Sequence, residues 1–205
     1  MVEFNTGYPD EIKKKLKTAC VGIAGLGGLG SNAAVSLTRA GVGKLILVDF
    51  DKIEQTNLNR QFYFKEQIGK YKTEALNENL KRINPDIELI LKNEKLVSGK
   101  MFEPFTDTDI IIEALDTAEM KAAFIEEVHS KLHHIPLIAA SGVAGYGKTD
   151  GIFTKQLGTL FIVYNPEAPS SEEGLLLAPM VNIIANWEAD LAIKIILDGF
   201  NADNS

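Results

Sequence analysis

A glycine-rich segment, AGLGGLGSN at residues 24–32, constrains the fold of this chain more than any other feature. The glycines at 25, 27 and 30 have the spacing G-x-G-x-x-G. The apolar run at 20–25 predicts a buried strand before them, and the periodicity of 29–40 predicts an amphipathic helix after them. Glycine allows backbone N–H groups to approach a phosphate at the N-terminus of such a helix. The segment therefore predicts a nucleotide-binding turn, which by itself fits a dinucleotide or ATP.

Strand-like and helix-like patterns alternate through the first two thirds of the chain. This alternation indicates βαβ units, and hence a Rossmann-like α/β fold with a mostly parallel sheet and helices on both faces. Strands are predicted at 20–25, 44–48, 87–91, 109–115 and 135–141, and helices at 9–19, 29–40, 72–83, 117–132 and, as a short one, within 98–105.

The last third of the chain has a different pattern. Residues 151–165, GIFTKQLGTLFIVYN, predict two strands broken near Leu157 and Gly158, which suits an antiparallel hairpin added to the sheet. Residues 180–198 predict a terminal amphipathic helix. We expect a single domain over 1–205, with a nucleotide-binding core at about 20–145 and the hairpin, a crossover loop and the terminal helix at about 146–200.

The composition is that of a globular protein and weighs against several classes of partner. The 205 residues are 45% hydrophobic and 24% charged, and the formal net charge is −7. This acidic balance weighs against a nucleic-acid binder held by a broad basic face. No apolar stretch approaches the roughly 20 residues that span a bilayer, and the start of the chain lacks the apolar region of a signal peptide. We expect a cytoplasmic protein that binds neither nucleic acid nor membrane.

The cysteine and histidine content gives little support to a metal site. The single cysteine, Cys20, excludes a disulfide or a four-cysteine zinc site within this chain, and its place in an apolar run predicts a buried, inert thiol. His129 and His133 could share a helix face with Glu126. Because that helix is expected to end near Leu132, a solvated helix end is the simpler interpretation.

Charged residues after the second strand favour a triphosphate ligand. Asp49 ends that strand about 20 residues beyond the glycine-rich turn, where a carboxylate can accept hydrogen bonds from ribose hydroxyls. NAD and ATP both carry a ribose. Arg60 and Lys72 follow, and they offer a forked guanidinium and a compact positive charge to phosphate oxygens. An NAD site needs no such pair of cations, so these residues favour ATP.

Short motifs in a specific order carry a family resemblance. They are G-x-G-G-x-G-S at 25–31, A-G-V-G at 40–43, L-V-D-F-D at 47–51, E-x-x-N-L-N-R-Q at 54–61, I-G-K-Y-K at 68–72, R-I-N-P at 82–85 and A-L-D-T at 114–117. With them the chain resembles the ThiF/MoeB/HesA family of the ubiquitin-activating-enzyme-like superfamily, strongly over about 10–145 and loosely beyond. It is similar in particular to the short, zinc-free branch of ThiF, the sulfur carrier protein adenylyltransferases.

The resemblance implies an ATP site and assigns its residues by position. Asp116 matches an aspartate that coordinates Mg²⁺, although its place before a helix would also suit an N-cap. Asp51 and Gln61 match as well, either as ligand contacts or as supports of the loop. The implied nucleotide-binding residues are Gly25, Gly27 and Gly28 for the phosphates, Asp49 for the ribose, and Asn57, Arg60 and Lys72 for the triphosphate; the implied catalytic residues are Arg60, Lys72 and Asp116.

The resemblance also implies a reaction and its partners. The C-terminal Gly-Gly carboxylate of a small ubiquitin-fold sulfur carrier protein attacks the α-phosphate of ATP, which gives an acyl-adenylate and pyrophosphate. No general base is needed, because a carboxylate is already ionised at pH 7. The expected pathway is thiamine biosynthesis, with a separate sulfur donor protein, and the expected assembly is a homodimer.

Three departures from the family pattern bear on these expectations. The paired C-x-x-C motifs of zinc-containing relatives are missing, so no zinc is expected. The crossover segment, about 166–178, has no cysteine that could take over the activated carrier. Relatives often supply an arginine from the partner subunit's N-terminal region, whereas the first arginine here is Arg39. Either a lysine among Lys13, Lys14, Lys15 and Lys17 substitutes, or this contribution is missing.

Other functions remain open at this point. A carrier of the molybdopterin or cysteine pathway has a similar tail, so it could replace the thiamine carrier. A non-catalytic member of the superfamily would bind carrier or nucleotide without turnover. An NAD-dependent oxidoreductase is disfavoured by Arg60 and Lys72, and a tRNA substrate is disfavoured by the acidic net charge.

Overall fold

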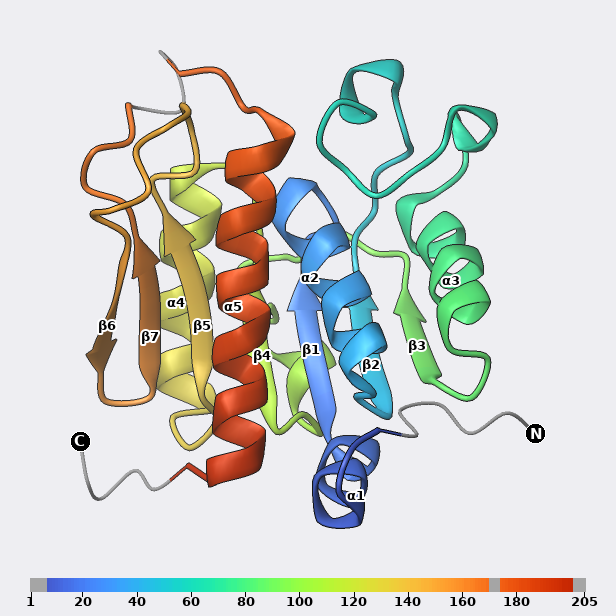
Figure 1. The fold of residues 1–205 in the computed structure, drawn as a ribbon. Helices are drawn as coiled ribbons and strands as arrows, with labels where there is room; N and C mark the ends of the chain where they lie inside the picture. The colour runs from blue at the N-terminus through green and yellow to red at the C-terminus, as the bar shows by residue number, and fades with distance from the viewer. Residues whose placement is uncertain (1–6, 170–173, 201–205) are drawn as a thin grey trace.

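The computed structural model describes residues 7–169 and 174–200, and they form a layered α/β structure (Figure 1). One seven-stranded sheet has the order β3-β2-β1-β4-β5-β7-β6. All neighbouring strands are parallel except β6, which pairs antiparallel with β7. The strands are β1 (Cys20–Ala24), β2 (Lys44–Val48), β3 (Glu88–Lys92), β4 (Ile110–Glu113), β5 (Leu137–Ser141), β6 (Phe153–Leu157) and β7 (Leu160–Tyr164). The predicted parallel sheet and the C-terminal hairpin are confirmed.

Helices cover both faces of this sheet. Figure 1 shows α2 and α5 together on the front face and α4 behind the sheet, while α3 lies beside β3. The helices are α1 (Asp10–Thr18), α2 (Gly28–Ala40), α3 (Lys72–Ile83), α4 (Ala118–Lys131) and α5 (Ala178–Asp198), with short 3-10 turns at Gln55–Asn57, Lys65–Gln67 and Glu103–Phe105. The terminal helix is confirmed, and it begins two residues before the predicted start at 180.

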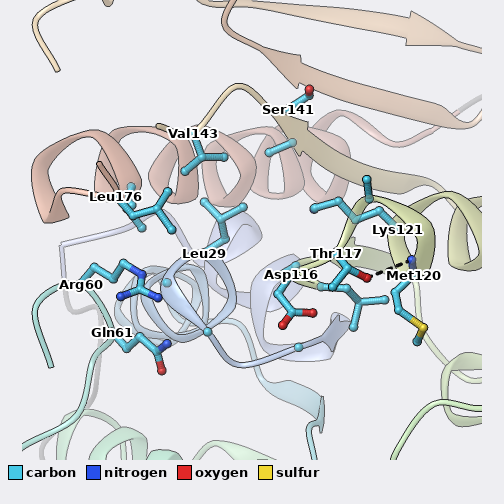
Figure 2. A pocket seen from close by; sticks show the side chains of 18 of the residues that line it. Leu29, Arg60, Gln61, Asp116, Thr117, Met120, Lys121, Ser141, Val143 and Leu176 are labelled. Atoms are coloured by element: carbon cyan, nitrogen blue, oxygen red, sulfur yellow. Dashed lines mark hydrogen bonds between the residues drawn. The ribbon is translucent and has the colours of Figure 1, made fainter. Parts of the chain in front are cut away.

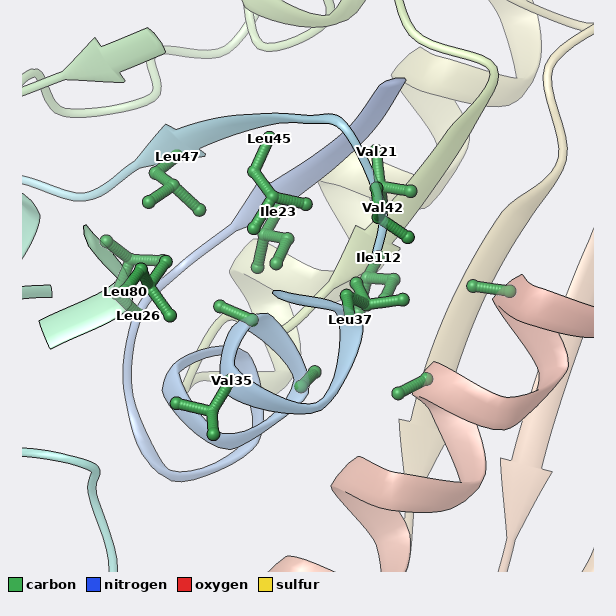
Figure 3. Packing of buried hydrophobic residues seen from close by; sticks show 14 of the residues in the cluster. Val21, Ile23, Leu26, Val35, Leu37, Val42, Leu45, Leu47, Leu80 and Ile112 are labelled. Atoms are coloured by element: carbon green, nitrogen blue, oxygen red, sulfur yellow. The ribbon is translucent and has the colours of Figure 1, made fainter. Parts of the chain in front are cut away.

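The alternation of side chains along the central strands explains the two layers. Val21 and Ile23 of β1 pack with α2, α3 and α5 on one face, whereas Cys20 and Ala24 belong to the cluster around Phe124 of α4 on the other face. Figure 3 shows the first cluster, in which the strand side chains meet those of α2. A strand that is buried on both faces reads as a continuous apolar run, and for this reason the sequence identified the central strands.

Some predicted boundaries differ from the structure. The short helix expected within 98–105 is a 3-10 turn of three residues, Glu103–Phe105. The strand expected at 109–115 ends at Glu113, because the chain leaves the sheet there and Leu115 N–H donates to the Glu113 side chain rather than to a neighbouring strand. Part of the crossover segment predicted at 166–178 lies outside the described residues.

The cysteine lies in the core, whereas the histidines lie at or just beyond the end of α4. Cys20 is buried at the head of β1, and burial raises the pKa of its thiol to about 11. Helix α4 ends at Lys131, so His133 lies beyond the helix that carries His129. Within 7–169 and 174–200, no three His, Cys, Asp or Glu side chains are grouped as a metal site would need. None of the described helices combines the length and apolar character that crossing a bilayer requires.

Candidate functional site

A cavity of about 830 Å³ opens at the carboxyl ends of β1, β2 and β4. Strand β1 pairs in parallel with β2 on one side and with β4 on the other. Successive strands are therefore added to one side of β1 up to β3 and to its other side from β4 on, so the strand order reverses here. Ligands of open α/β sheets bind in the crevice at such a reversal. All ten site residues proposed from the sequence line this cavity: Gly25, Gly27, Gly28, Asp49, Asp51, Asn57, Arg60, Gln61, Lys72 and Asp116.

The glycines of the turn between β1 and α2 are needed for different physical reasons. Gly25 has φ +91°, and a Cβ there would lie 2.6 Å from the Ala114 carbonyl oxygen. A Cβ on Gly30 would lie 1.9 Å from the carbonyl oxygen of Gly25, so this glycine allows the helix to pack on the turn. A Cβ on Gly27 would meet only Gln61 Nε2, at 3.8 Å. Packing within the fold therefore does not require Gly27, which lines the open cavity.

Asp49 connects the end of β2 to the glycine-rich turn. Its Oδ2 accepts a hydrogen bond from Leu26 N–H at 2.7 Å, and its Oδ1 accepts one from Asp51 N–H at 2.7 Å. Lys72 Nζ lies 2.7 Å from Asp51 Oδ2 and 3.7 Å from Asp49 Oδ2, at the start of α3. Burial raises the pKa of the Asp49 carboxyl, and the charge of Lys72 opposes that shift. Asp49, Asp51 and Lys72 thus form one electrostatic unit at the cavity wall.

The loop after β2 brings a guanidinium group and two amides to the cavity. Arg60 Nη1 donates to Thr56 O at 3.1 Å and to Asn59 Oδ1 at 2.8 Å, and within the described chain Arg60 has no carboxylate partner. Asn57 Oδ1 accepts from Glu54 N–H at 3.0 Å, so this side chain also caps a turn of the loop. Gln61 is only 9% exposed, and its Oε1 has no hydrogen-bond partner in the described structure.

Asp116 follows β4 and is exposed at the cavity. The N-cap of α4 is Thr117, whose hydroxyl accepts from Met120 N–H at 3.3 Å, as the dashed line in Figure 2 marks. The alternative interpretation of Asp116 as the N-cap is therefore wrong, and its carboxylate is not used by the helix. Figure 2 shows Asp116 between Arg60 and Gln61 on one side and Lys121 on the other.

Sequence reasoning missed part of the cavity wall. Buried Glu113 and partly buried Lys121 form an ion pair with Nζ–Oε2 at 2.9 Å, and Lys121 lines the cavity. The sequence signal for this ion pair was Glu113 itself, a charged residue inside the apolar run DIIIEAL. Burying a glutamate there without a partner would be costly, so a cationic partner could have been expected. Another missed part is the side of the cavity formed by Ser141, Val143 and Leu176, which the apolar character of their segments did not distinguish from core.

Comparison with known proteins places these features in a family. The sequence profile of the ThiF family matches residues 4–204. An adenylyltransferase and sulfurtransferase of Meyerozyma guilliermondii is 30% identical over 189 residues, which are 89% of this chain and 44% of that protein. A ubiquitin-like modifier-activating enzyme of Gallus gallus is 36% identical over 122 residues, 54% of this chain and 31% of that protein. The chain thus spans less than half the length of these curated relatives.

A solved structure gives the same fold. The E. coli tRNA N6-threonylcarbamoyladenosine dehydratase, crystallised in complex with ATP, superposes with a TM-score of 0.85 at 21% identity, covering 93% of this chain and 90% of that one. The motif-based resemblance is thereby confirmed at the family level, since the profile match extends over nearly the whole sequence. The chain, with its glycine-rich turn, the Asp49–Lys72 unit and Asp116 around one cavity, belongs to the ThiF family.

Proposed function

We propose that this protein is an ATP-dependent adenylyltransferase that activates the C-terminal Gly-Gly carboxylate of a small ubiquitin-fold sulfur carrier protein. The observation that carries the proposal is the Arg60 guanidinium, which lines the cavity without a carboxylate partner in the described chain. A half-buried cation without a carboxylate partner, beside a glycine-rich helix N-terminus, favours polyphosphate. The names of the relatives, which include an adenylyltransferase and an activating enzyme, support the same class of reaction.

The residues around the cavity fit the parts of Mg-ATP. Gly25, Gly27 and Gly28 line the cavity, and beside Gly27 there is space for phosphate that the fold does not use. Asp49, already oriented by two backbone N–H groups, has lone pairs left for a ribose hydroxyl. Gln61 Oε1, which has no protein partner, would gain one from a bound nucleotide or its water.

Asp116 is the residue that would hold Mg²⁺. Its carboxylate is exposed at the cavity and is not used as a helix cap. A single protein carboxylate suffices, because Mg²⁺ in nucleotide sites keeps water and substrate phosphates as its other ligands. When bound, the ion offsets the repulsion between an anionic nucleophile and phosphate. Asn57, Arg60 and Lys72 would contact the triphosphate from the opposite side, with Lys72 oriented by Asp51.

The chemistry requires placement of two anions more than proton transfer. A carboxylate oxygen attacks the α-phosphorus, the new O–P bond forms, and the P–O bond to pyrophosphate breaks. The cationic groups of Arg60 and Lys72 stabilise the charge that develops on the leaving pyrophosphate. Since the nucleophile is ionised at pH 7, no histidine is needed at the cavity.

The partners belong to this proposal as well. The family resemblance implies a carrier protein with a Gly-Gly tail, a separate sulfur donor and a homodimeric assembly. The relatives compared above carry names of sulfur transfer, ubiquitin-like modification and tRNA modification, and none of these names refers to thiamine. A carrier of the thiamine pathway is therefore one member of a panel, together with carriers of the molybdopterin and cysteine pathways.

The test is ATP–pyrophosphate exchange measured with that panel. We expect exchange that depends on Mg²⁺ and on one carrier with a free Gly-Gly carboxylate. A carrier that lacks the last glycine serves as the matched control and should support no exchange. Tight Mg-ATP binding without exchange for any carrier would instead identify a non-catalytic member of the family. Exchange stimulated by tRNA would contradict the carrier as substrate.

A further inference from the structure

An ion pair forms part of one cavity wall and has no place in the roles assigned above. Glu113, the last residue of β4, is fully buried, and its Oε1 and Oε2 accept hydrogen bonds from Lys121 Nζ at 3.1 and 2.9 Å. Oε1 also accepts from Leu115 N–H at 2.7 Å. Lys121 comes from the first turns of α4, and its side chain lines the cavity with 24% of its surface exposed. The core carboxylate thus fixes the position of an ammonium group at the cavity wall.

Lys121 keeps hydrogen-bonding capacity for a ligand. An ammonium group has three N–H donors, whereas both hydrogen bonds of Lys121 go to the one carboxylate of Glu113. Because Glu113 lies in the core and Lys121 borders the cavity, the pair presents its positive end to the cavity. A buried ion pair contributes little net stability, since desolvation offsets its attraction. Packing alone therefore gives no reason for these charges.

The position of Lys121 separates it from the other cations of the cavity wall. Arg60 and Lys72 belong to the loop after β2 and the start of α3, on the side of the glycine-rich turn. Lys95 lies over the Phe50 ring, with Nζ 5.5 Å from the centroid, beyond the end of β3. Lys121 lies on the other side of Asp116, toward the end of β5 (Figure 2). A group that binds there approaches the phosphates from the opposite direction to Arg60.

We propose that Lys121 binds the carboxylate of the incoming substrate and that Glu113 is the positioning residue that orients Lys121. The inference rests on the proposed function, because it assumes a carboxylate nucleophile. One substrate oxygen would accept a hydrogen bond from the remaining N–H of Lys121 while the other oxygen attacks the α-phosphorus. As the new O–P bond forms, the P–O bond to pyrophosphate breaks, and no proton changes place.

The variants must avoid leaving a buried charge without a partner. Removing Lys121 alone would leave Glu113 uncompensated in the core, which is strongly destabilising. The double variant Lys121→Met/Glu113→Gln replaces the pair with two neutral side chains of similar length. Lys121→Arg keeps the charge, and Lys131→Met removes an exposed lysine from the end of the same helix as the matched control. Thermal unfolding of each variant shows whether it is folded before binding is measured.

The measurement compares two probe peptides by calorimetry, with the protein saturated by a non-hydrolysable Mg-ATP analogue. One hexapeptide ends in Gly-Gly with a free carboxylate, and the other has the same sequence with a C-terminal amide. The unmodified protein and Lys131→Met should bind the acid about tenfold or more tightly than the amide, the factor expected for a hydrogen bond between charged groups. In the double variant this ratio should fall to about one, whereas Lys121→Arg should retain part of it.

Each other outcome decides a different point. If the double variant still prefers the acid by the full factor, the assignment of Lys121 is wrong while the proposed substrate stands. If the double variant loses affinity for the nucleotide analogue itself, Lys121 binds phosphate, and the proposed role is again wrong. If the unmodified protein does not distinguish the two peptides, both the Gly-Gly substrate and the role of Lys121 are contradicted.

Discussion

Among the residues that the structure describes, the guanidinium group of Arg60 donates hydrogen bonds only to neutral oxygens, those of Thr56 and Asn59, and this makes its contribution to binding separable from stability. We expect Arg60→Met to raise the dissociation constant of Mg-ATP by about tenfold or more, the range for a lost hydrogen bond to a charged group. Arg60→Lys should give an intermediate value, because a lysine keeps the charge and loses the fork. Calorimetry with Mg-ATP measures both.

The control for this prediction is Arg39→Met. Arg39 is exposed in the last turn of α2 and is not among the residues that line the cavity. The Arg39→Met substitution removes the same charge from the protein as Arg60→Met does, so a long-range electrostatic effect would change the dissociation constants of both variants alike. Equal dissociation constants for the Arg60 and Arg39 variants would contradict a direct contact between Arg60 and phosphate.

Glu188 on α5 gives a prediction about stability and pH. It is fully buried, and neither carboxyl oxygen has a hydrogen-bond partner in the described structure. Burial raises its pKa well above the usual value, with Lys121 opposing and Glu113 adding to the shift. A carboxyl whose folded pKa is raised stabilises the fold below the unfolded pKa, about 4.3, and loses that contribution as pH rises toward the folded pKa.

The test uses Glu188→Gln, which cannot ionise. Relative to this variant, the unmodified protein should lose stability as pH rises above about 4.3, with a limiting slope of about 1.4 kcal/mol per pH unit. Urea unfolding at pH 5, 6, 7 and 8 measures the difference. Glu126→Gln, an exposed position on α4, should leave the pH profile of the unmodified protein unchanged. Parallel profiles for Glu188→Gln and the unmodified protein would show that Glu188 is ionised and has a partner.

In the turn between β1 and α2, Gly30 is needed for the packing of the fold, whereas we expect Gly27 to be needed for ligand binding. Gly30→Ala should destabilise the protein by about 3 kcal/mol or more, because its Cβ would lie 1.9 Å from a backbone oxygen that cannot move independently of the strand. Gly27→Ala should change the free energy of unfolding by only about 1 kcal/mol, since the nearest atom is 3.8 Å from its Cβ. Its methyl group would nevertheless stand in the cavity and weaken Mg-ATP binding.

Urea unfolding together with ATP calorimetry separates the two effects. Gly69→Ala, at an open loop position with φ +87°, measures the cost of backbone strain without a clash. If Gly27→Ala binds Mg-ATP as well as the unmodified protein does, the phosphates do not approach this part of the turn. If Gly30→Ala unfolds like the unmodified protein, the close packing of helix and turn is not essential.

The same elements show why the fold was predictable and part of the site was not. Strands such as β2 (Lys44–Val48) are largely buried on both faces, and helices such as α3 have one apolar stripe, so local pattern determines both. The family resemblance assigned Asp49, Arg60 and Asp116 to one site, and all three line one cavity. Asp49 and Asp116 follow β2 and β4, whose carboxyl ends meet at one edge of the parallel sheet. Glu113, Lys121 and Glu188 come from β4, α4 and α5, and only the packed fold brings them together.

For the whole molecule, the choice between ATP and NAD can be measured as ligand-linked stability. A ligand that binds only the folded protein at 100 times its dissociation constant stabilises it by about 2.7 kcal/mol. For a domain of 150–250 residues, 1 kcal/mol corresponds to roughly 2–4 °C in Tm, so saturating Mg-ATP should raise Tm by about 5–11 °C. NAD at the same concentration should raise it far less, because a dinucleotide does not pair its charge with both Arg60 and Lys72.

Magnesium should account for part of this shift through Asp116. We expect Asp116→Asn to reduce the difference between the Tm measured with Mg-ATP and the Tm measured with ATP and a chelator, while stability without nucleotide changes little, since the carboxylate is exposed and does not cap α4. Differential scanning calorimetry of the whole chain measures both quantities, with Asp190→Asn, an exposed aspartate on α5, as the control. An equal Mg²⁺-dependent shift in both variants would remove Asp116 from the metal site.

A shift with NAD that matches the shift with Mg-ATP would contradict ATP as the ligand of this cavity.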